Sequence, residues 1–364
     1  MATRRSILFG ISSLALSAAS AADRNEKALL GYDWAYDNAG TIEPPLDILL
    51  GSAGDLSAWI NNVRPALTAV FGAVPLPAPI SVSDGQWQAT ANGLSLLQVT
   101  AEYAPGVVKP GGPTPYVGAL IGRPDNLDPS KPLIIALHGH EAPHRGDPPI
   151  RLWLDHWWPE ALTRAGYIVI TPSHLPYAQF SNLYGVHDYH VVWTRFIWLL
   201  VQACLATPSG VPPFSGMACA GLSSGGTTGA LLMAWRPEIT KGVFAGSFLP
   251  IEFLRRNYRI AGHPNQWNLR NVYSYLPYYL LLADREVQWQ LGKADAFYPD
   301  HTAFPSNGGN FAGTDRDVMV TEILGEYLPV RDAAAKLGGR VELCIHDGGH
   351  DFKVPQALTF LAPK

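Results

Sequence analysis

From Leu133 onward, short apolar runs alternate with longer segments whose apolar residues have helical spacing. Apolar runs of about four to eight residues are typical of strands buried on both faces, as in parallel sheets. Such strands are predicted at Leu133–Leu137, Tyr167–Thr171, Met217–Leu222, Gly242–Phe248, Val287–Gln290 and Val341–Ile345. Helices are predicted between them at Leu152–Arg164, His187–Ala206, Thr227–Trp235 and Val318–Lys336. This alternation indicates parallel βαβ units.

Two earlier strands, Leu94–Tyr103 and Tyr116–Arg123, are separated by Pro- and Gly-rich turn residues, which indicates an antiparallel pair. Together the pattern predicts an α/β domain over residues 94–364, with about eight mostly parallel strands and helices on both faces. Residues 22–93 are predicted to form an N-terminal extension packed on this domain, with a helical pattern around Leu56–Phe71.

Residues 1–21 have the pattern of an export signal. Arg4-Arg5 precedes an apolar run from Ile7 to about Ala18, and Ala19-Ser20-Ala21 resembles a small-residue cleavage site. The arginine pair resembles a twin-arginine signal but is also common in ordinary secretory signals, so both routes stay open. The apolar run is too short for a stable membrane span. We therefore expect a bacterial protein exported to the periplasm or the medium.

The amino-acid composition limits the classes of function that the protein can have. The 364 residues are 47% hydrophobic and 15% charged, as in globular proteins. The net charge of −4 leaves no basic surplus for phosphate groups, so nucleic acid is not expected as a partner. Three cysteines, Cys204, Cys219 and Cys344, are too few for a disulfide framework. Buried thiols are favoured, and a Cys204–Cys219 bridge stays open.

The strand Met217–Leu222 leads into a Gly-x-Ser-x-Gly motif that is followed by a helical pattern. A serine at such a corner adopts strained backbone geometry, so the residues two before and two after it must be very small. Gly221 and Gly225 meet this need for Ser223. Ser224 would have a leucine at the first position, so Ser223 is the predicted nucleophile. Ser224 offers its backbone N–H at the helix start to an oxyanion.

A second strand end, after Leu133–Leu137, carries His138-Gly139-His140. The glycine lets the backbone turn so that a following N–H faces the nucleophile, which predicts the N–H groups of His140 and Ser224 as the oxyanion pair. A zinc site is the alternative, because His-x-His after a strand can bind metal. Its ligands would be His138, His140, Glu141 and His144.

The third strand end supplies a histidine. Val341–Ile345 is followed by His346 and then by Gly348-Gly349-His350, and a flexible glycine pair would let an imidazole reach a serine at the same sheet edge. His350 fits the general base better than His346, which is within or just past the strand.

Two carboxylates compete for the role of orienting the imidazole. Asp284 follows the apolar run Leu280-Leu281-Leu282 and looks like a strand end, but its charged neighbours suggest a surface ion pair. Asp295 follows Val287–Gln290 on a Gly-Lys-Ala-Asp turn closed by an aromatic residue and Pro299, which suits a positioned carboxylate. Asp295 is therefore the predicted acid.

These motifs together resemble the α/β-hydrolase superfamily over Leu94–Lys364, and within it the dienelactone-hydrolase and acetyl-xylan-esterase-like branch. The residues that carry the resemblance are Leu137-His138-Gly139-His140, Gly221-Leu222-Ser223-Ser224-Gly225-Gly226, Gly292-Lys293-Ala294-Asp295 with Phe297-Tyr298-Pro299, and His346-Asp347-Gly348-Gly349-His350-Asp351-Phe352. In such enzymes a Gly-Lys-x-Asp loop followed by aromatic-Pro carries the triad acid, which also favours Asp295. The chain departs from relatives with Ala-Pro-Arg-Pro before the acid strand, because it has Ala283-Asp284-Arg285-Glu286.

The resemblance implies a serine esterase with the triad Ser223, His350 and Asp295 and no cofactor. Its substrate would be a small-molecule or carbohydrate ester, such as an acetyl or aryl ester of plant polysaccharide. Lactones and amides stay open, because the same triad cleaves them. The rivals from other classes are a catalytically silent binding protein and a zinc-dependent hydrolase.

Overall fold

The structure is a computed structural model of the chain. It describes residues 52–73, 81–90, 93–102, 116–139, 158–173, 189–248, 279–292 and 316–363. The predicted export segment, residues 1–21, lies outside the described residues. The described helices are α5 (Ala53–Ala73), α7 (Trp158–Arg164), α9 (Tyr189–Leu205), α10 (Ser224–Trp235), α13 (Arg316–Leu337) and α14 (Val354–Leu361). The strands are β1 (Ser81–Asp84), β2 (Gln88–Ala89), β3 (Leu94–Glu102), β4 (Tyr116–Pro124), β5 (Leu133–Leu137), β6 (Val169–Pro172), β7 (Met217–Leu222), β8 (Ile239–Ala245), β9 (Glu286–Gly292) and β10 (Arg340–His346).

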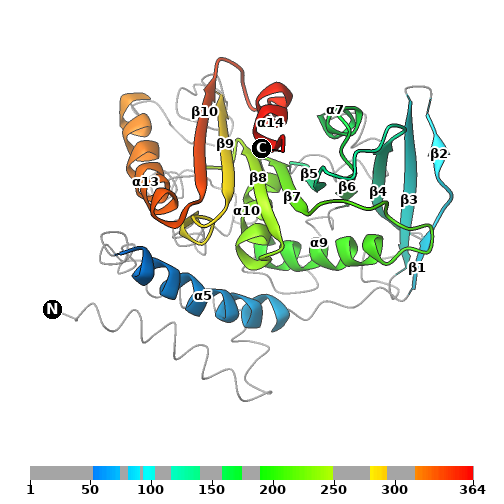
Figure 1. The fold of residues 1–364 in the computed structure, drawn as a ribbon, viewed down its shortest axis with the longest axis horizontal. Coiled ribbons are helices and arrows are strands. Elements are labelled where there is room, and N and C mark those ends of the chain that lie inside the picture. Colours follow the sequence, from blue (N-terminus) through cyan, green and yellow to red (C-terminus); the bar gives the residue numbers. More distant parts are fainter. Residues whose placement is uncertain are drawn as a thin grey trace, which may run out of the picture.

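The ten described strands form one sheet in the order β1-β3-β4-β6-β5-β7-β8-β9-β10, with β2 paired to β3 (Figure 1). In this order, β6, β5, β7, β8, β9 and β10 run parallel to one another. The strands β1 to β4 pair antiparallel, and β4 joins β6 antiparallel. The mostly parallel sheet and the antiparallel pair β3–β4 confirm the prediction. The short strands β1 and β2 add two to the eight expected.

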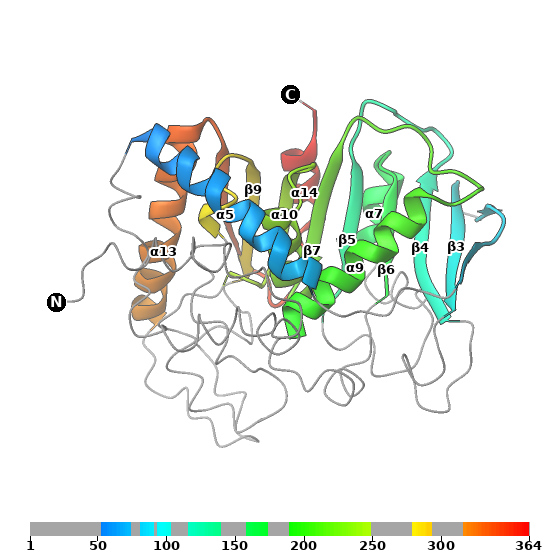
Figure 2. The same ribbon diagram turned by 90° about the horizontal axis from the view of Figure 1, so that it is seen from below.

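Helices cover both faces of the sheet, as predicted. Along β5, Leu133, Ile135 and Leu137 belong to the core shared with α5, α9, α10 and α13. The alternate residues Ile134 and Ala136 belong to a second core with α7 and α14. This alternation is the period-two geometry of a strand buried on both sides. Figures 1 and 2 show α5 and α9 against one face, with α7 and α14 against the other.

The helix α5 belongs to this core. Ser52 and Asp55 cap its start reciprocally: the Ser52 N–H donates to Asp55 Oδ2 at 2.9 Å, and the Asp55 N–H donates to Ser52 Oγ at 3.2 Å. Leu56, Trp59 and Ile60 are buried in the core formed with α9, α10 and α13. The predicted helical pattern around Leu56–Phe71 is therefore confirmed, although the boundary between extension and main domain stays a prediction.

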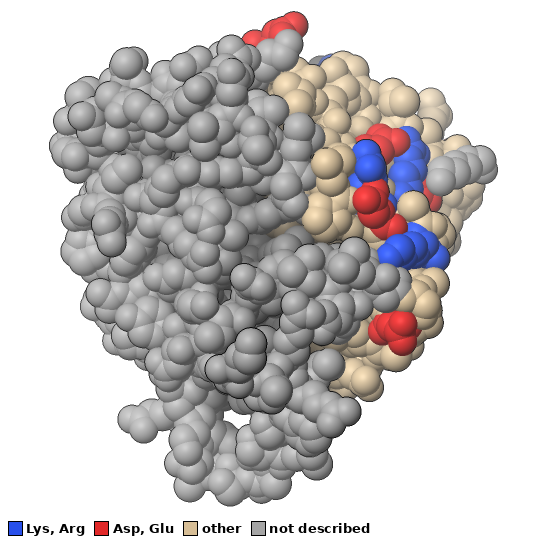
Figure 3. All heavy atoms as spheres, turned by 90° about the vertical axis from the view of Figure 1, so that its left-hand side faces the viewer, with Lys and Arg blue, Asp and Glu red and all other residues tan. Residues whose placement is uncertain are grey.

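The three cysteines are free thiols, so the Cys204–Cys219 bridge left open by the sequence is not formed. Burial raises the pKa of the Cys204 thiol to about 12. No helix of the described residues is long and apolar enough to cross a membrane. On the side that α13 occupies in Figure 1, the described acidic and basic side chains lie interspersed (Figure 3).

Candidate active site

Ser223 stands at the corner between β7 and α10 in a strained conformation. Its φ of 58° and ψ of −127° make it the only non-glycine residue with positive φ among the described residues. Hydrogen bonds on both sides fix the corner: the Ser223 N–H donates to the Ala245 carbonyl at 2.8 Å, and the Ser223 carbonyl accepts from the N–H of Gly226 at 2.9 Å. Strain of this kind persists only where the surroundings enforce it, which is common at functional sites.

The glycines flanking Ser223 are required by backbone contacts. A Cβ atom on Gly221 would lie 2.3 Å from the Gly225 carbonyl oxygen. A Cβ atom on Gly225 would lie 2.3 Å from the carbonyl oxygens of both Leu137 and His138. Any side chain at either position would therefore collide with main-chain atoms, which is the steric requirement that the motif predicted.

The loop after β5 lies directly beside the serine. A Cβ atom on Gly139 would be 3.3 Å from Ser223 Cβ and 3.9 Å from Ser223 Oγ. This places the backbone just before His140 next to the hydroxyl, although His140 itself lies outside the described residues. Ser224 is buried and is the first residue of α10. Amides in the first helical turn lack intrahelical acceptors and favour negative charge.

The side chain of His138 is buried and makes structural contacts. Its Nδ1 lies 2.7 Å from the Gly139 carbonyl oxygen. The ring packs edge-on to Trp193 with centroids 6.5 Å apart. The other residues of the alternative metal site, His140, Glu141 and His144, lie outside the described residues.

His350 lies in the loop, residues 347–353, between β10 and α14. Gly292, the last residue of β9, pairs in register with His346, the last residue of β10. A Cβ atom on Gly292 would lie 2.1 Å from the Gly349 carbonyl oxygen, so the loop backbone rests directly on the end of β9. His350 therefore follows a close contact with the strand that leads to Asp295.

The chain after His350 returns across the sheet. Phe352 stacks on Trp158 of α7 with ring centroids 4.3 Å apart. Lys353 hydrogen-bonds through its backbone to Gln290 of β9, and α14 then packs on β8 and α7. Because β8 lies between β7 and β9, the loop runs from the edge strand β10 toward β7, the strand that precedes Ser223.

His346 is engaged within the same loop. The ring is buried, and Nδ1 accepts a hydrogen bond from the Gly348 N–H at 3.1 Å. Nε2 lies 3.6 Å from Asp351 Oδ1, and the other oxygen of Asp351 binds Lys353 Nζ at 2.6 Å. These contacts give His346 a role in holding the loop.

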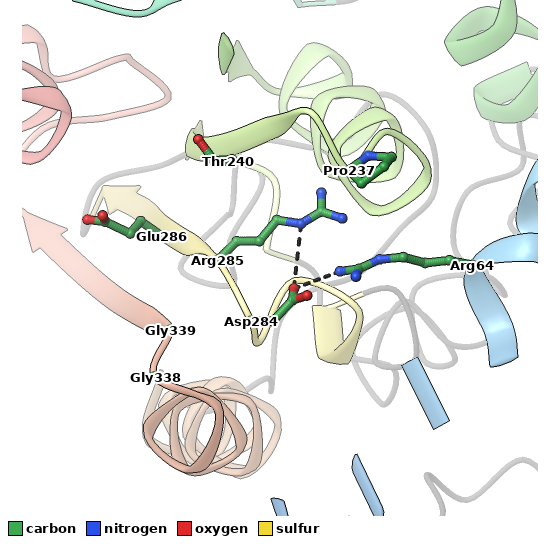
Figure 4. Close-up of a pocket in the computed structure, with 8 residues that line it drawn as sticks. All are labelled: Arg64, Pro237, Thr240, Asp284, Arg285, Glu286, Gly338 and Gly339. Carbon is green, nitrogen blue, oxygen red and sulfur yellow. Dashed lines mark hydrogen bonds and ion pairs between the residues drawn. The ribbon is translucent and has the colours of Figure 1, made fainter. Parts of the chain in front are cut away.

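Asp284 lies at the amino-terminal ends of the parallel strands, whereas Ser223 lies at their carboxyl-terminal ends. It precedes β9, whereas Ser223 follows the parallel strand β7, and the seven residues of β9 span roughly 20 Å. Residues 279–280 are helical and residues 281–284 form a turn. The prediction of a strand end before Asp284 was therefore wrong. Its carboxylate binds Arg64 at 2.6 Å and Arg285 at 3.5 Å (Figure 4). Asp295, three residues beyond the carboxyl end of β9, lies outside the described residues.

A cavity of about 330 Å³ lies at these amino-terminal strand ends, lined by Arg64, Pro237, Thr240, Asp284, Arg285, Glu286, Gly338 and Gly339 (Figure 4). Arg285, 6% exposed, donates from Nη1 to the carbonyls of Met233, Arg236 and Ile239. Burial lowers the pKa of Arg285 to about 10, so it remains charged at neutral pH. This cation binds carbonyls at the end of α10 and at the start of β8, and the cavity is remote from Ser223.

Three solved structures with a similar architecture are described as esterases. A CE15 glucuronoyl esterase from Teredinibacter turnerae T7901 matches with a TM-score of 0.53 and 14% identity, over 86% of this chain and 84% of that one. A putative acetyl xylan esterase from Bacteroides fragilis NCTC 9343 matches at 0.54 and 15%, over 87% and 82%. A glucuronoyl esterase from Solibacter usitatus matches at 0.52 and 12%, over 86% and 93%. The chain has the α/β-hydrolase fold.

No protein-family model matches the sequence, and no curated protein is significantly similar to it. At these identities the likeness is one of fold, so the α/β-hydrolase architecture is established and the superfamily resemblance is confirmed at that level. In this fold the nucleophile stands on a strand-to-helix corner, the place that Ser223 occupies. Gln290 was not among the predicted site residues. Its signal in the sequence is an amide within a strand that is otherwise largely apolar, and the side chain is fully buried.

Proposed function

We propose that this protein is a serine hydrolase that cleaves carboxylic esters. The observation that carries the proposal is the strained corner at Ser223, which is enforced by backbone contacts at both flanking glycines. A positive φ at a non-glycine residue is costly and is retained where it exposes a reactive group. The esterase descriptions of three proteins with the same fold support the reaction class.

In the proposed mechanism, the Ser223 hydroxyl attacks the ester carbonyl while His350 accepts its proton. Asp295 orients the imidazole and stabilises its cation, and the N–H groups of Ser224 and His140 bind the oxyanion. His350 then donates the proton to the leaving alcohol, and water repeats the cycle to release the acid. The loop that returns from β10 toward β7 supports His350 in this role.

We propose a carbohydrate ester as the substrate, because two of the fold neighbours are described as glucuronoyl esterases and one as a putative acetyl xylan esterase. An exported enzyme would meet such esters outside the cell, and the twin-arginine-like segment at residues 1–21 supports export. Turnover of acetylated xylan, a methyl ester of glucuronic acid and p-nitrophenyl acetate would separate acetyl from glucuronoyl ester preference.

Labelling with a fluorophosphonate tests the nucleophile. The probe should modify the wild-type protein on the peptide containing Ser223, and both labelling and p-nitrophenyl acetate turnover should vanish in Ser223→Ala. Ser215→Ala is the matched control, because this exposed serine precedes the amino end of the same strand β7. Labelling that persists in Ser223→Ala would refute the assignment. Loss of activity with a chelator would favour the zinc alternative.

A further inference from the structure

The strand β9 carries two amides on a buried face. Val287, Trp289 and Leu291 point into the core with α10 and α13, as apolar residues of a buried strand should. The alternate residues Gln288 and Gln290 are buried as well, at 5% and 0% exposure. A buried amide is stable only when its hydrogen-bonding groups have partners, so these two positions require specific contacts.

Gln290 binds the main chain at the end of the histidine loop. Its Oε1 accepts from the Lys353 N–H at 2.8 Å, and its Nε2 donates to the Lys353 carbonyl at 3.1 Å. The second hydrogen of Nε2 is used by Gln288 Oε1 at 3.0 Å. The amide side chain thus donates to and accepts from the Lys353 main chain, as the backbone of a neighbouring strand would. Its oxygen and both of its N–H groups are hydrogen-bonded.

The main chain of Gln290 is anchored at the same sheet edge. Its carbonyl accepts from the Gly246 N–H at 2.9 Å, directly after β8, and Ala245 pairs with Gln290 in register. The Ser223 N–H binds the Ala245 carbonyl at 2.8 Å. A short chain of contacts therefore connects the serine corner, through β8 and Gln290, to the backbone three residues after His350.

We propose that Gln290 is a positioning residue for His350, a role that rests on the proposed serine-hydrolase function. The amide fixes the end of the loop, and the contact between Gly292 and Gly349 fixes its beginning. Because Gln290 also lies five residues before Asp295, one side chain sets the spacing between the strand that leads to the acid and the loop that carries the base.

Gln290→Met tests the role, because methionine has a similar length and flexibility but cannot form these hydrogen bonds. Gln288→Met is the matched control: it lies on the same face of the same strand and contacts Gln290 rather than Lys353. We expect kcat for p-nitrophenyl acetate to fall by roughly 10- to 100-fold in Gln290→Met with KM nearly unchanged, because a misplaced base affects the chemical step. Gln288→Met should lose much less.

Hydrogen exchange supplies a readout that does not depend on activity. Amides of residues 347–353 should exchange faster in Gln290→Met than in Gln288→Met, while those of α10 remain protected. Should Gln290→Met fail to fold, Gln290→Asn replaces it. The shorter side chain keeps the amide but reaches Lys353 less well, so an intermediate fall in kcat is expected.

The outcomes separate the two hypotheses. A wild-type protein that fluorophosphonate does not label refutes the serine-hydrolase function, and the positioning role with it. A labelled wild type, with equal kcat and equal loop exchange in the Gln290 and Gln288 variants, refutes only the role of Gln290. A fall in kcat that is accompanied by an equal rise in KM, or by general loss of protection, would also refute it, because the amide would then act on binding or on the whole fold.

Discussion

At the scale of single residues, Ser223 combines strain with rigid support. A non-glycine residue in this backbone region costs of order 1–3 kcal/mol, which the neighbouring contacts must offset. The hydrogen bonds of Ser223 to Ala245 and Gly226 and the close packing of Gly221 on Gly225 provide that support. The hydroxyl is thereby held at a half-buried corner where its backbone has little freedom to relax.

This packing predicts the effect of a single methyl group. Gly225→Ala should lower the free energy of unfolding by about 1–3 kcal/mol and slow fluorophosphonate labelling of Ser223, because the new Cβ atom overlaps two main-chain carbonyls. Gly216→Ala is the control, since a Cβ atom at that position, just before β7, meets nothing within 4 Å. Denaturant unfolding measures both variants. Equal stability in the two would contradict the crowded corner.

Asp284 precedes β9 in the sequence and Asp295 follows it. This order predicts which of the two aspartates matters for turnover. Asp295→Asn should reduce kcat by about 10³- to 10⁴-fold, because a triad histidine without its carboxylate loses the correct tautomer and a stabilised cation. Asp284→Asn should leave kcat unchanged, since Asp284 lies before β9 and binds Arg64. Steady-state kinetics with p-nitrophenyl acetate distinguish them. The opposite ranking would remove Asp295 from the mechanism.

The sequence could identify the serine corner and an ion pair at Asp284, but it misjudged the structure that precedes Asp284, for a physical reason. The corner is a local motif, in which steric demands act between residues close in the chain. The run Leu280-Leu281-Leu282 is apolar, and periodicity alone cannot separate a short buried strand from a buried turn. The contact that fixes Asp284 comes from Arg64, 220 residues away in sequence, and no local pattern reveals it.

At the scale of elements, some boundaries were predicted closely and others were not. The strands β5 (Leu133–Leu137) and β7 (Met217–Leu222) have the expected bounds. The helix α9 (Tyr189–Leu205) closely follows the expected His187–Ala206, whereas β8 starts and ends three residues before the expected strand. Gly246, with a φ of +56°, ends β8 at a turn that apolar content could not indicate. The short helix α14 was not predicted. Its eight residues are too few for a clear periodic pattern.

The end of α10 depends on Arg285, which predicts a stability effect without an effect on catalysis. Arg285→Met should lower the free energy of unfolding by about 2–4 kcal/mol, because the carbonyls of Met233, Arg236 and Ile239 lose a charged donor. Arg331→Met should change stability little, since this exposed side chain pairs with its neighbour Asp332. Thermal unfolding and kcat at 25 °C should be measured together. A fall in kcat of folded Arg285→Met would show that this edge is coupled to the active site.

At the scale of the whole molecule, residues before the predicted catalytic domain are part of its framework. The strands β1 and β2 extend the sheet beyond β3, and α5 packs on α9, α10 and α13. The sequence predicted the helix, but its place depended on contacts with elements more than a hundred residues later. Arg64 of α5 also binds Asp284 and the Leu281 carbonyl, which links this segment to the start of β9.

This arrangement predicts that α5 and the sheet unfold as one unit. Leu56→Ala should lower the free energy of unfolding by about 2–5 kcal/mol, because the leucine is fully buried in the core shared with α9 and α10. Asn61→Ala, at an exposed position of the same helix, should change it by no more than about 0.5 kcal/mol. The thermal transitions measured by circular dichroism and by turnover of p-nitrophenyl acetate should shift together in Leu56→Ala. An early partial loss of helical signal, with the activity midpoint unchanged, would instead mean that α5 is an appendage and that the core folds without it.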